Sequence, residues 1–373
     1  MCAPLAPLPH TLYLMPYTFI PHPIPPNIIL SSFFIINYCY MNKLLFFLAF
    51  AAFAGCRDKT PGLQSIGSIQ SLDPSLENII DSTAPVEIIA EGFNWTEGPL
   101  WAESEKMLLF SDIPPNKIFK WTEAKGAELY LTPSGYTGTV PRTGEPGSNG
   151  LLLNREGKLV LCQHGDRRMA IMDAPLNAPE AAFVSLADNY GGKRFNSPND
   201  AVFRSNGDLF FTDPAYGLEK AMDDPAKEIP FQGVYKVNSQ GEVRLLTNAI
   251  TRPNGIAFIN NEKTLIVANS DPQKPVWYMF DIDAGDSLHN ETLLFDATEA
   301  SKKEQGMPDG LKVDGQGNIF ATGPGGVWIF NASGKLAGKI SVPQPCSNVA
   351  LADGDKTLYI TANMYVLRVK MRK

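Results

Sequence analysis

The chain has 373 residues, a formal net charge of −7, 44% hydrophobic residues and 19% charged residues, values typical of a folded globular protein. The acidic balance argues against a nucleic-acid binder, which needs a cationic surface. With only four histidines, a zinc site built from several of them is not expected.

The first 56 residues have the features of an export signal rather than of a fold. Residues 1–40 contain no Lys, Arg, Asp or Glu, whereas Met41 is followed by a lysine, a short apolar run and the small residues before Cys56, the order of a secretory signal. The ending before Cys56 resembles a bacterial lipobox. We therefore predict a true start at Met41 and a protein of the periplasm or cell envelope, lipid-anchored at Cys56. The alternative, a membrane span, needs about 20 apolar residues, more than this run provides.

Residues 57–80 contain Pro, Gly, Ser and charges, and are predicted to form a flexible tether. Beyond Cys56, the thiols left are Cys162 and Cys346. Sequence cannot show that their Cα atoms come close enough to pair, and we expect no disulfide.

A repeat organises the chain from residue 81 to 373. Each unit is a polar residue, a short apolar strand, a turn rich in Asn, Gly or Asp, and a second apolar strand. High glycine and proline contents, 31 and 30 residues, fit many short strands. A spacing near 50 residues is typical of a four-stranded propeller blade. The polar residues that lead the six units are Glu97, Asn149, Asn199, Asn254, Asp309 and Asn348.

Six units predict an all-β fold, a six-bladed β-propeller. The segments at 233–237 with 242–246, and at 327–331 with 336–340, are interpreted as outer strands of blades. Residues 80–93 are expected to supply an outer strand that closes the ring with the last blade.

The lead residues also predict an axial metal site. The innermost strand of each blade lines the channel, so carboxylate and amide oxygens from six blades would point toward the axis. Such hard ligands suit Ca²⁺, with Mg²⁺, Mn²⁺ or Zn²⁺ as alternatives. A competing interpretation is that each Asn-Gly or Asp-Gly is simply a tight turn.

Several motifs together resemble the gluconolactonase and regucalcin (senescence-marker-protein) family, in its bacterial gluconolactonase branch. They are Glu97-Gly98-Pro99, Pro198-Asn199-Asp200, Pro253-Asn254-Gly255 and Pro308-Asp309-Gly310, with EPGSNGL from residue 145 and HGDRR from residue 164. The resemblance implies a six-bladed propeller with one axial divalent cation on Glu97, Asn199, Asn254 and Asp309. It implies a hydrolase acting on a sugar lactone, with Asp309 as base and Asn199 also meeting the substrate.

The residues leave other roles open. Asp200 is the second candidate for the base. Substrate contacts are expected from Asn149, His164, Arg194, Asp200 and Asn348, while Tyr216 is expected to pack the channel wall. Relatives of the regucalcin type carry an arginine where Ser197 stands, which puts the role of the nearby Arg194 in question. The alternatives to a lactonase are a phosphotriester hydrolase at the same cation and a non-catalytic ligand-binding propeller.

Overall fold

The computed structural model describes residues 63–372. The predicted signal, the start at Met41 and the lipid site at Cys56 lie outside these residues. None of the described helices is both long enough and apolar enough to cross a membrane.

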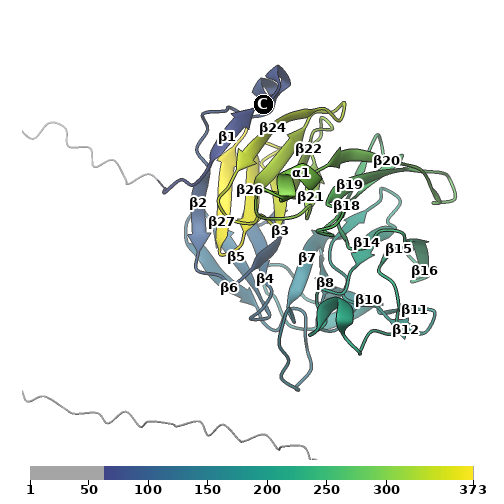
Figure 1. Cartoon of the computed structure of the whole chain (residues 1–373). Helices are drawn as coiled ribbons and strands as arrows, with labels where there is room; N and C mark the ends of the chain where they lie inside the picture. The colour runs from purple at the N-terminus through teal and green to yellow at the C-terminus, as the bar shows by residue number, and fades with distance from the viewer. Residues whose placement is uncertain (1–62, 373) are drawn as a thin grey trace, which may run out of the picture. The chain divides into compact units, whose positions relative to one another are not determined.

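The described chain folds into six antiparallel sheets that form the blades (Figure 1). Blade one contains β3 (Thr96–Ala102), β4 (Met107–Asp112), β5 (Lys117–Thr122) and β6 (Gly126–Leu131). Blade two contains β7 (Ser148–Leu153), β8 (Leu159–Gln163), β9 (Arg168–Met172) and β10 (Phe183–Ala187). Blade three contains β13 (Ala201–Phe203), β14 (Leu209–Asp213), β15 (Gly233–Val237) and β16 (Val243–Thr247). Blade four contains β17 (Pro253–Ile259), β18 (Thr264–Asn269), β19 (Val276–Ile282) and β20 (Leu288–Asp296).

The last two blades each take a strand from the N-terminal side of the domain. Blade five contains β21 (Leu311–Val313), β22 (Ile319–Gly323), β23 (Gly326–Phe330), β24 (Leu336–Ser341) and β1 (Ser68–Ser71). Blade six contains β25 (Asn348–Ala352), β26 (Thr357–Ala362), β27 (Tyr365–Lys370) and β2 (Glu87–Glu91). Short elements between blades are the β11–β12 hairpin (Asn189–Tyr190, Lys193–Arg194), the 3₁₀ helices η1 (Pro74–Asn78) and η2 (Ala221–Asp223), and α1 (Thr298–Ser301).

The blades form a closed ring. Each inner strand contacts the inner strand of the next blade, in the order β3, β7, β13, β17, β21, β25 and back to β3. Strand β2 pairs antiparallel with β27, so the N-terminal and C-terminal ends of the domain share blade six (Figure 1). The predicted six-bladed propeller and its closing strand are therefore confirmed.

The core is divided among the blade interfaces. Six clusters of buried apolar residues exist, one between each pair of neighbouring blades. Strand β18 shows why: Leu265 and Val267 join one cluster, while Ile266 and Ala268 join the next. Alternate side chains of a strand point to opposite faces, so a sheet packed on both sides needs apolar residues throughout.

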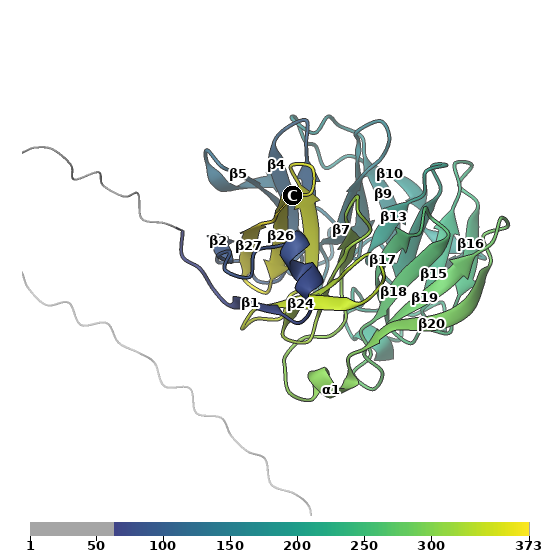
Figure 2. The ribbon, with the colours of Figure 1, turned by 90° about the horizontal axis from the view of Figure 1, so that it is seen from above.

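The predicted tether over 57–80 is wrong for its described part. Strand β1 pairs with β24, and the two strands lie side by side in Figure 2. Asp73 caps η1, because its side chain accepts a hydrogen bond from the Ser75 amide at 3.0 Å. Ile69 and Leu76 are buried in the core between blades five and six. Their burial makes this segment part of the propeller, which thus begins before residue 81.

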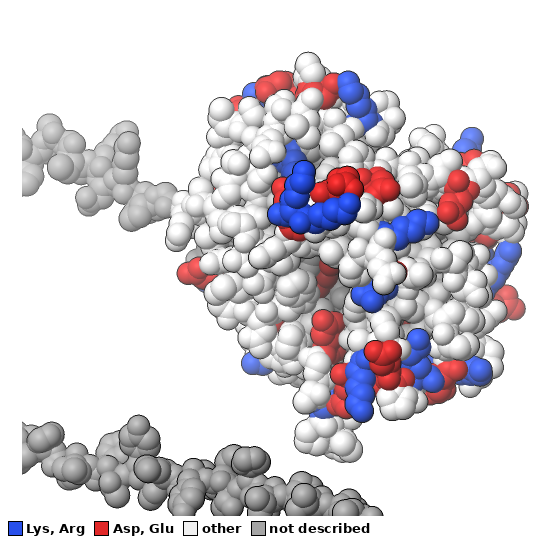
Figure 3. All heavy atoms as spheres, in the orientation of Figure 1, with Lys and Arg blue, Asp and Glu red and all other residues white. Residues whose placement is uncertain are grey.

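Charges are mixed on the face that Figure 3 shows, where Lys and Arg lie among Asp and Glu. Some ion pairs of the described residues, such as Lys106–Glu103 and Lys302–Glu299, are exposed on both sides and are worth little stability. Cys162 and Cys346 are both buried and unpaired.

Candidate metal and substrate site

The lead residues of neighbouring blades lie against each other around the axis. A Cβ on Gly98 would stand 2.1 Å from the Asn149 carbonyl oxygen, and one on Gly255 would stand 2.2 Å from that of Asp309. A Cβ on Gly150 would likewise overlap the Asn199 carbonyl oxygen, and one on Gly310 would overlap the Asn348 side chain. Gly150 and Gly255 lie inside strands β7 and β17. These glycines let backbones meet at the axis, so the tight-turn interpretation is wrong for them.

A second polar position, 14 or 15 residues after the lead, fixes the segment that enters the inner strand. Asp112 accepts the amides of Asn94 and Trp95, both at 3.0 Å. Asp213 accepts those of Asn196 at 2.9 Å and Ser197 at 2.8 Å. Asn269 accepts the amide of Arg252 at 2.9 Å. Asp213 therefore orients the segment that carries Asn199.

Hydroxyl groups join adjacent blades at the same level. Ser111 Oγ donates to the Asn149 carbonyl at 2.9 Å and Thr212 Oγ1 donates to the Asn254 carbonyl at 2.8 Å. Both hydroxyls are fully buried. Such bonds hold the lead residues of separate blades in one fixed arrangement.

Three side-chain oxygens of the ring are buried without a hydrogen-bond donor: Oδ1 of Asn149, of Asn199 and of Asp309. They come from blades two, three and five. Buried polar atoms are normally hydrogen-bonded, and exceptions call for an explanation such as an ion. The side-chain amide nitrogen of Asn254 donates to Ser270 Oγ at 2.9 Å, so the side-chain oxygen of Asn254 can bind another partner.

Negative charge gathers around these oxygens. Burial, with the charges of Asp200 and Glu145, raises the pKa of Glu97 to about 8. Burial and the charge of Glu97 raise the pKa of Asp309 well above its ordinary value. Carboxylates that share a buried site without a counter-charge resist ionisation, so this site favours a cation.

Asp200 and Asn348 form a polar group of their own with Lys312. Asp200 Oδ2 lies 3.6 Å from Lys312 Nζ and accepts the Asn348 amide at 3.3 Å. Asn348 Oδ1 in turn accepts from Lys312 Nζ at 3.4 Å, and the Asn348 amide also contacts Glu97. Asn348 therefore connects Glu97 to Asp200 rather than being left free for substrate. Lys312 was not predicted.

Replacing Lys312 with methionine should destabilise the protein by on the order of 3 kcal/mol, because it leaves the buried Asp200 carboxylate without its charged partner. The Asp200 side chain is 3% exposed. Lys120→Met is a matched control, since Lys120 also lies 3.6 Å from its carboxylate partner, Glu128, whose side chain is 39% exposed. The control should change stability by less than about 1 kcal/mol. Equal urea midpoints for the two variants would contradict this role of Lys312.

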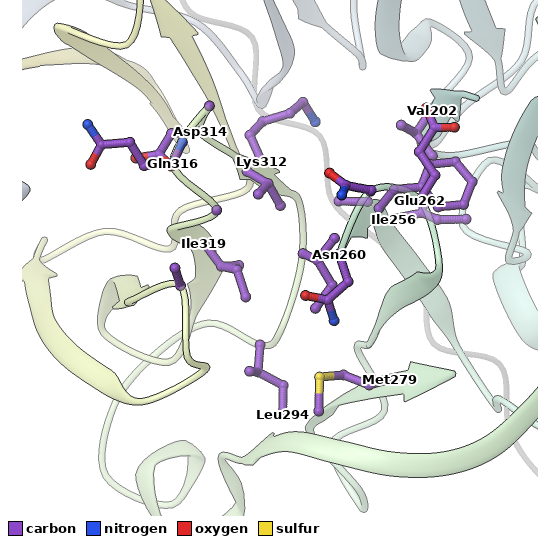
Figure 4. A pocket seen from close by; sticks show the side chains of 18 of the residues that line it. Val202, Ile256, Asn260, Glu262, Met279, Leu294, Lys312, Asp314, Gln316 and Ile319 are labelled. Atoms are coloured by element: carbon purple, nitrogen blue, oxygen red, sulfur yellow. The ribbon is translucent and has the colours of Figure 1, made fainter. Parts of the chain in front are cut away.

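A cavity of about 900 Å³ is lined by residues of blades two, three, four and five, with Lys312 among them (Figure 4). Met279, Leu294 and Asn260 line other parts of it. None of the six lead residues lines this cavity. It is therefore separate from the ring of oxygens, and Lys312 is the residue common to both neighbourhoods.

The other predicted substrate residues have different outcomes. His164 is fully buried, and its Nδ1 lies 3.5 Å from Oε2 of Glu145, a residue that was not predicted. Arg194 does not join the ring, since it lies on the exposed β12 and its guanidinium donates to the Asp166 carbonyl at 3.1 Å. Tyr216 was expected only to pack, but burial, together with the nearby charge of Asp309, raises the pKa of its hydroxyl.

The donor set fits a hard divalent cation, since carboxylate and amide oxygens are the ligands that Ca²⁺ accepts. Over residues 63–372, no group of three or more His, Cys, Asp and Glu side chains is arranged to hold a metal. Two of the four predicted ligands, Asn199 and Asn254, are amides. A group defined by His, Cys, Asp and Glu alone does not include them.

Fold and ring together define a six-bladed propeller with an axial site of carboxylate and amide oxygens. Residues 95–364 match the family described as SMP-30/Gluconolactonase/LRE-like region, and the chain belongs to this family. The predicted membership is thus confirmed.

Similar proteins include several lactonases. The chain is 38% identical to a gluconolactonase of Zymomonas mobilis over 83% of this chain and 87% of that protein. It is 24% identical to a pentonolactonase of Haloferax volcanii over 71% of this chain and 80% of that protein. The solved structure of a gluconolactonase from Xanthomonas campestris aligns with a TM-score of 0.70 at 25% identity, covering 83% of this chain and 98% of that one.

Proposed function

We propose that this protein hydrolyses a sugar lactone, adding water to the cyclic ester at one divalent cation, Ca²⁺. Glu97, Asn199, Asn254 and Asp309 would hold the ion. The observation that carries the proposal is the set of buried, donor-free oxygens from separate blades beside two buried carboxylates. The identity to a gluconolactonase over most of both chains supports the substrate class.

A bound divalent cation supplies Lewis-acid polarisation of the ester carbonyl and lowers the pKa of water. The two amide ligands add no charge, so Glu97 and Asp309 would provide the only anionic ligands. The site would therefore neutralise the ion's charge without adding an excess of anionic ligands.

Asp309 is the better candidate for the base that takes the proton from water. Its Oδ1 is buried and has no hydrogen-bond donor among the described residues, while the residue as a whole keeps some exposure. Asp200 is fully engaged: its Oδ1 accepts the Ala201 amide at 2.8 Å, and its Oδ2 faces Lys312 and Asn348.

Asn199 has a free acceptor in Oδ1. Its amide nitrogen is a donor, so one side chain can face the ion through oxygen and the lactone through nitrogen. The backbone hydrogen bond from Gly150 N to the Asn199 carbonyl, at 2.8 Å, fixes the position of Asn199.

Proton release from glucono-1,5-lactone, measured by pH-stat with the spontaneous rate subtracted, tests the proposal. Metal-loaded protein should accelerate ring opening by several orders of magnitude, and should act far more slowly on a phosphotriester such as paraoxon. Faster hydrolysis of the phosphotriester would favour the competing hydrolase class, and no turnover of any ester would favour a binding propeller.

A further inference from the structure

His164 is buried in a way that calls for a partner. Its side chain is 0% exposed, and neither ring nitrogen has a hydrogen-bond partner among the described residues. Buried polar atoms are rarely left in this state. Gly217 of blade three packs closely against this side chain, since a Cβ on Gly217 would stand 2.5 Å from His164 Cβ.

Glu145 is the charged group that faces this imidazole. Its Oε2 lies 3.5 Å from His164 Nδ1, and its side chain is 35% exposed, so one part faces the histidine while another reaches solvent. Burial is the main cause of the raised pKa of Glu97, Asp309 and Tyr216, and the charge of Glu145 adds to it in each case. Glu145 thus lies at the ring, although it comes from the β6–β7 loop and not from an inner strand.

The loop that carries Glu145 is fixed in place. Arg142 donates to the Gly165 carbonyl at 2.7 Å and to the Gly217 carbonyl at 2.6 Å. The Thr143 amide donates to Glu219 Oε1 at 3.0 Å. Bonds to the loops of blades two and three hold Glu145 over the site, and a group held in advance binds its ligand at a lower entropy cost.

We propose that Glu145, supported by His164, binds a hydroxyl group of the lactone and so selects polyhydroxylated substrates; this rests on the lactonase function proposed above. A carboxylate offers only acceptors, and sugar hydroxyls are donors. A further carboxylate near Glu97, Asp309 and Asp200 also disfavours anionic substrates. His164 is a positioning residue that orients Glu145.

The test compares two six-membered lactones, glucono-1,5-lactone with its hydroxyls and δ-valerolactone without them. Glu145→Gln should raise KM for glucono-1,5-lactone about tenfold, the loss expected for a hydrogen bond to a charged group. It should leave KM for δ-valerolactone within about twofold. His164→Ala should shift the same ratio in the same direction, and Glu145→Asp, which keeps the charge but shortens the reach, should fall between.

Glu156→Gln is the control, because Glu156 is an exposed carboxylate on the turn between β7 and β8 and, among the described residues, has no bond to the loop that carries Glu145; both KM values should stay unchanged. If Glu145→Gln changes KM for both lactones by the same factor, or changes neither KM, the proposed role of Glu145 is overturned, while the lactonase function stands. If the metal-loaded natural protein opens neither lactone, the lactonase function is wrong and the selection by Glu145 falls with it. If Glu145→Gln does not fold, Glu145→Asp decides by the same ratio.

Discussion

Replacing Asp309 with asparagine is expected to lower kcat/KM for glucono-1,5-lactone by about 10³-fold to 10⁴-fold, since a general base contributes up to this much. The variant should fold. It removes one of two buried carboxylates that repel each other, so the metal-free protein should melt at a temperature equal to or above that of the natural protein. Initial rates at saturating Ca²⁺ and a thermal melt in EDTA measure the two effects.

Asp200→Asn distinguishes the two candidate bases. It keeps the shape of the side chain but removes the charge that faces Lys312. We expect Asp200→Asn to lower stability, as Lys312→Met should. At a temperature where both variants are folded, it should lower the rate of lactone hydrolysis less than Asp309→Asn does. The reverse order of rates would assign the base to Asp200.

The repeat of lead residues was readable from the sequence because the propeller repeats its backbone geometry. Each lead sits at the same phase of its blade, and Gly98, Gly150, Gly255 and Gly310 follow four of the six leads. The structure gives the reason, since a side chain there would overlap the next blade. The pattern is readable in the sequence because four of the six blades have the same small residue at this position near the axis.

The parts that sequence reasoning missed are set by contacts between distant segments. Asp112, Asp213 and Asn269 follow their leads at a nearly constant interval, a signal that was present but ambiguous because such residues also shape turns. Glu145 and Lys312 carry no such signal. Glu145 reaches the ring through a loop held by Arg142, and Lys312 is recognised only by its distance to Asp200.

Arg194 illustrates the opposite error. Its closeness in sequence to Asn199 made it a candidate, but the hairpin of β11 and β12 carries it to the surface. The segment over 63–80 was also misread, because its polar residues obscured the spacing of Ile69, Leu76, Ile79 and Ile80, which are all buried.

Removing divalent ions with EDTA is expected to abolish lactone hydrolysis, and added Ca²⁺ should restore it, if Glu97, Asn199, Asn254 and Asp309 hold the ion as proposed. The fold should persist, because ring closure depends on β2 with β27 and on the apolar blade interfaces. Ca²⁺ should raise the melting temperature, since an ion that binds only the folded state stabilises it by about 2.7 kcal/mol at one hundred times Kd. Full activity in EDTA would contradict a catalytic cation.

The affinity for Ca²⁺ should fall as the pH is lowered below about 8, the pKa to which burial and nearby charges raise Glu97 in the metal-free protein. The sign follows from competition: below that pH the carboxyl is protonated, and a ligand must lose its proton to bind the ion. Each unit of pH below this value should weaken binding by up to about tenfold for one released proton. Calorimetry of Ca²⁺ binding at pH 7, in buffers of different ionisation enthalpy, would count that proton. The Glu97→Gln variant, which has no carboxyl to titrate, should release fewer protons, and an equal number from both proteins would place the competing proton on another group, such as Asp309.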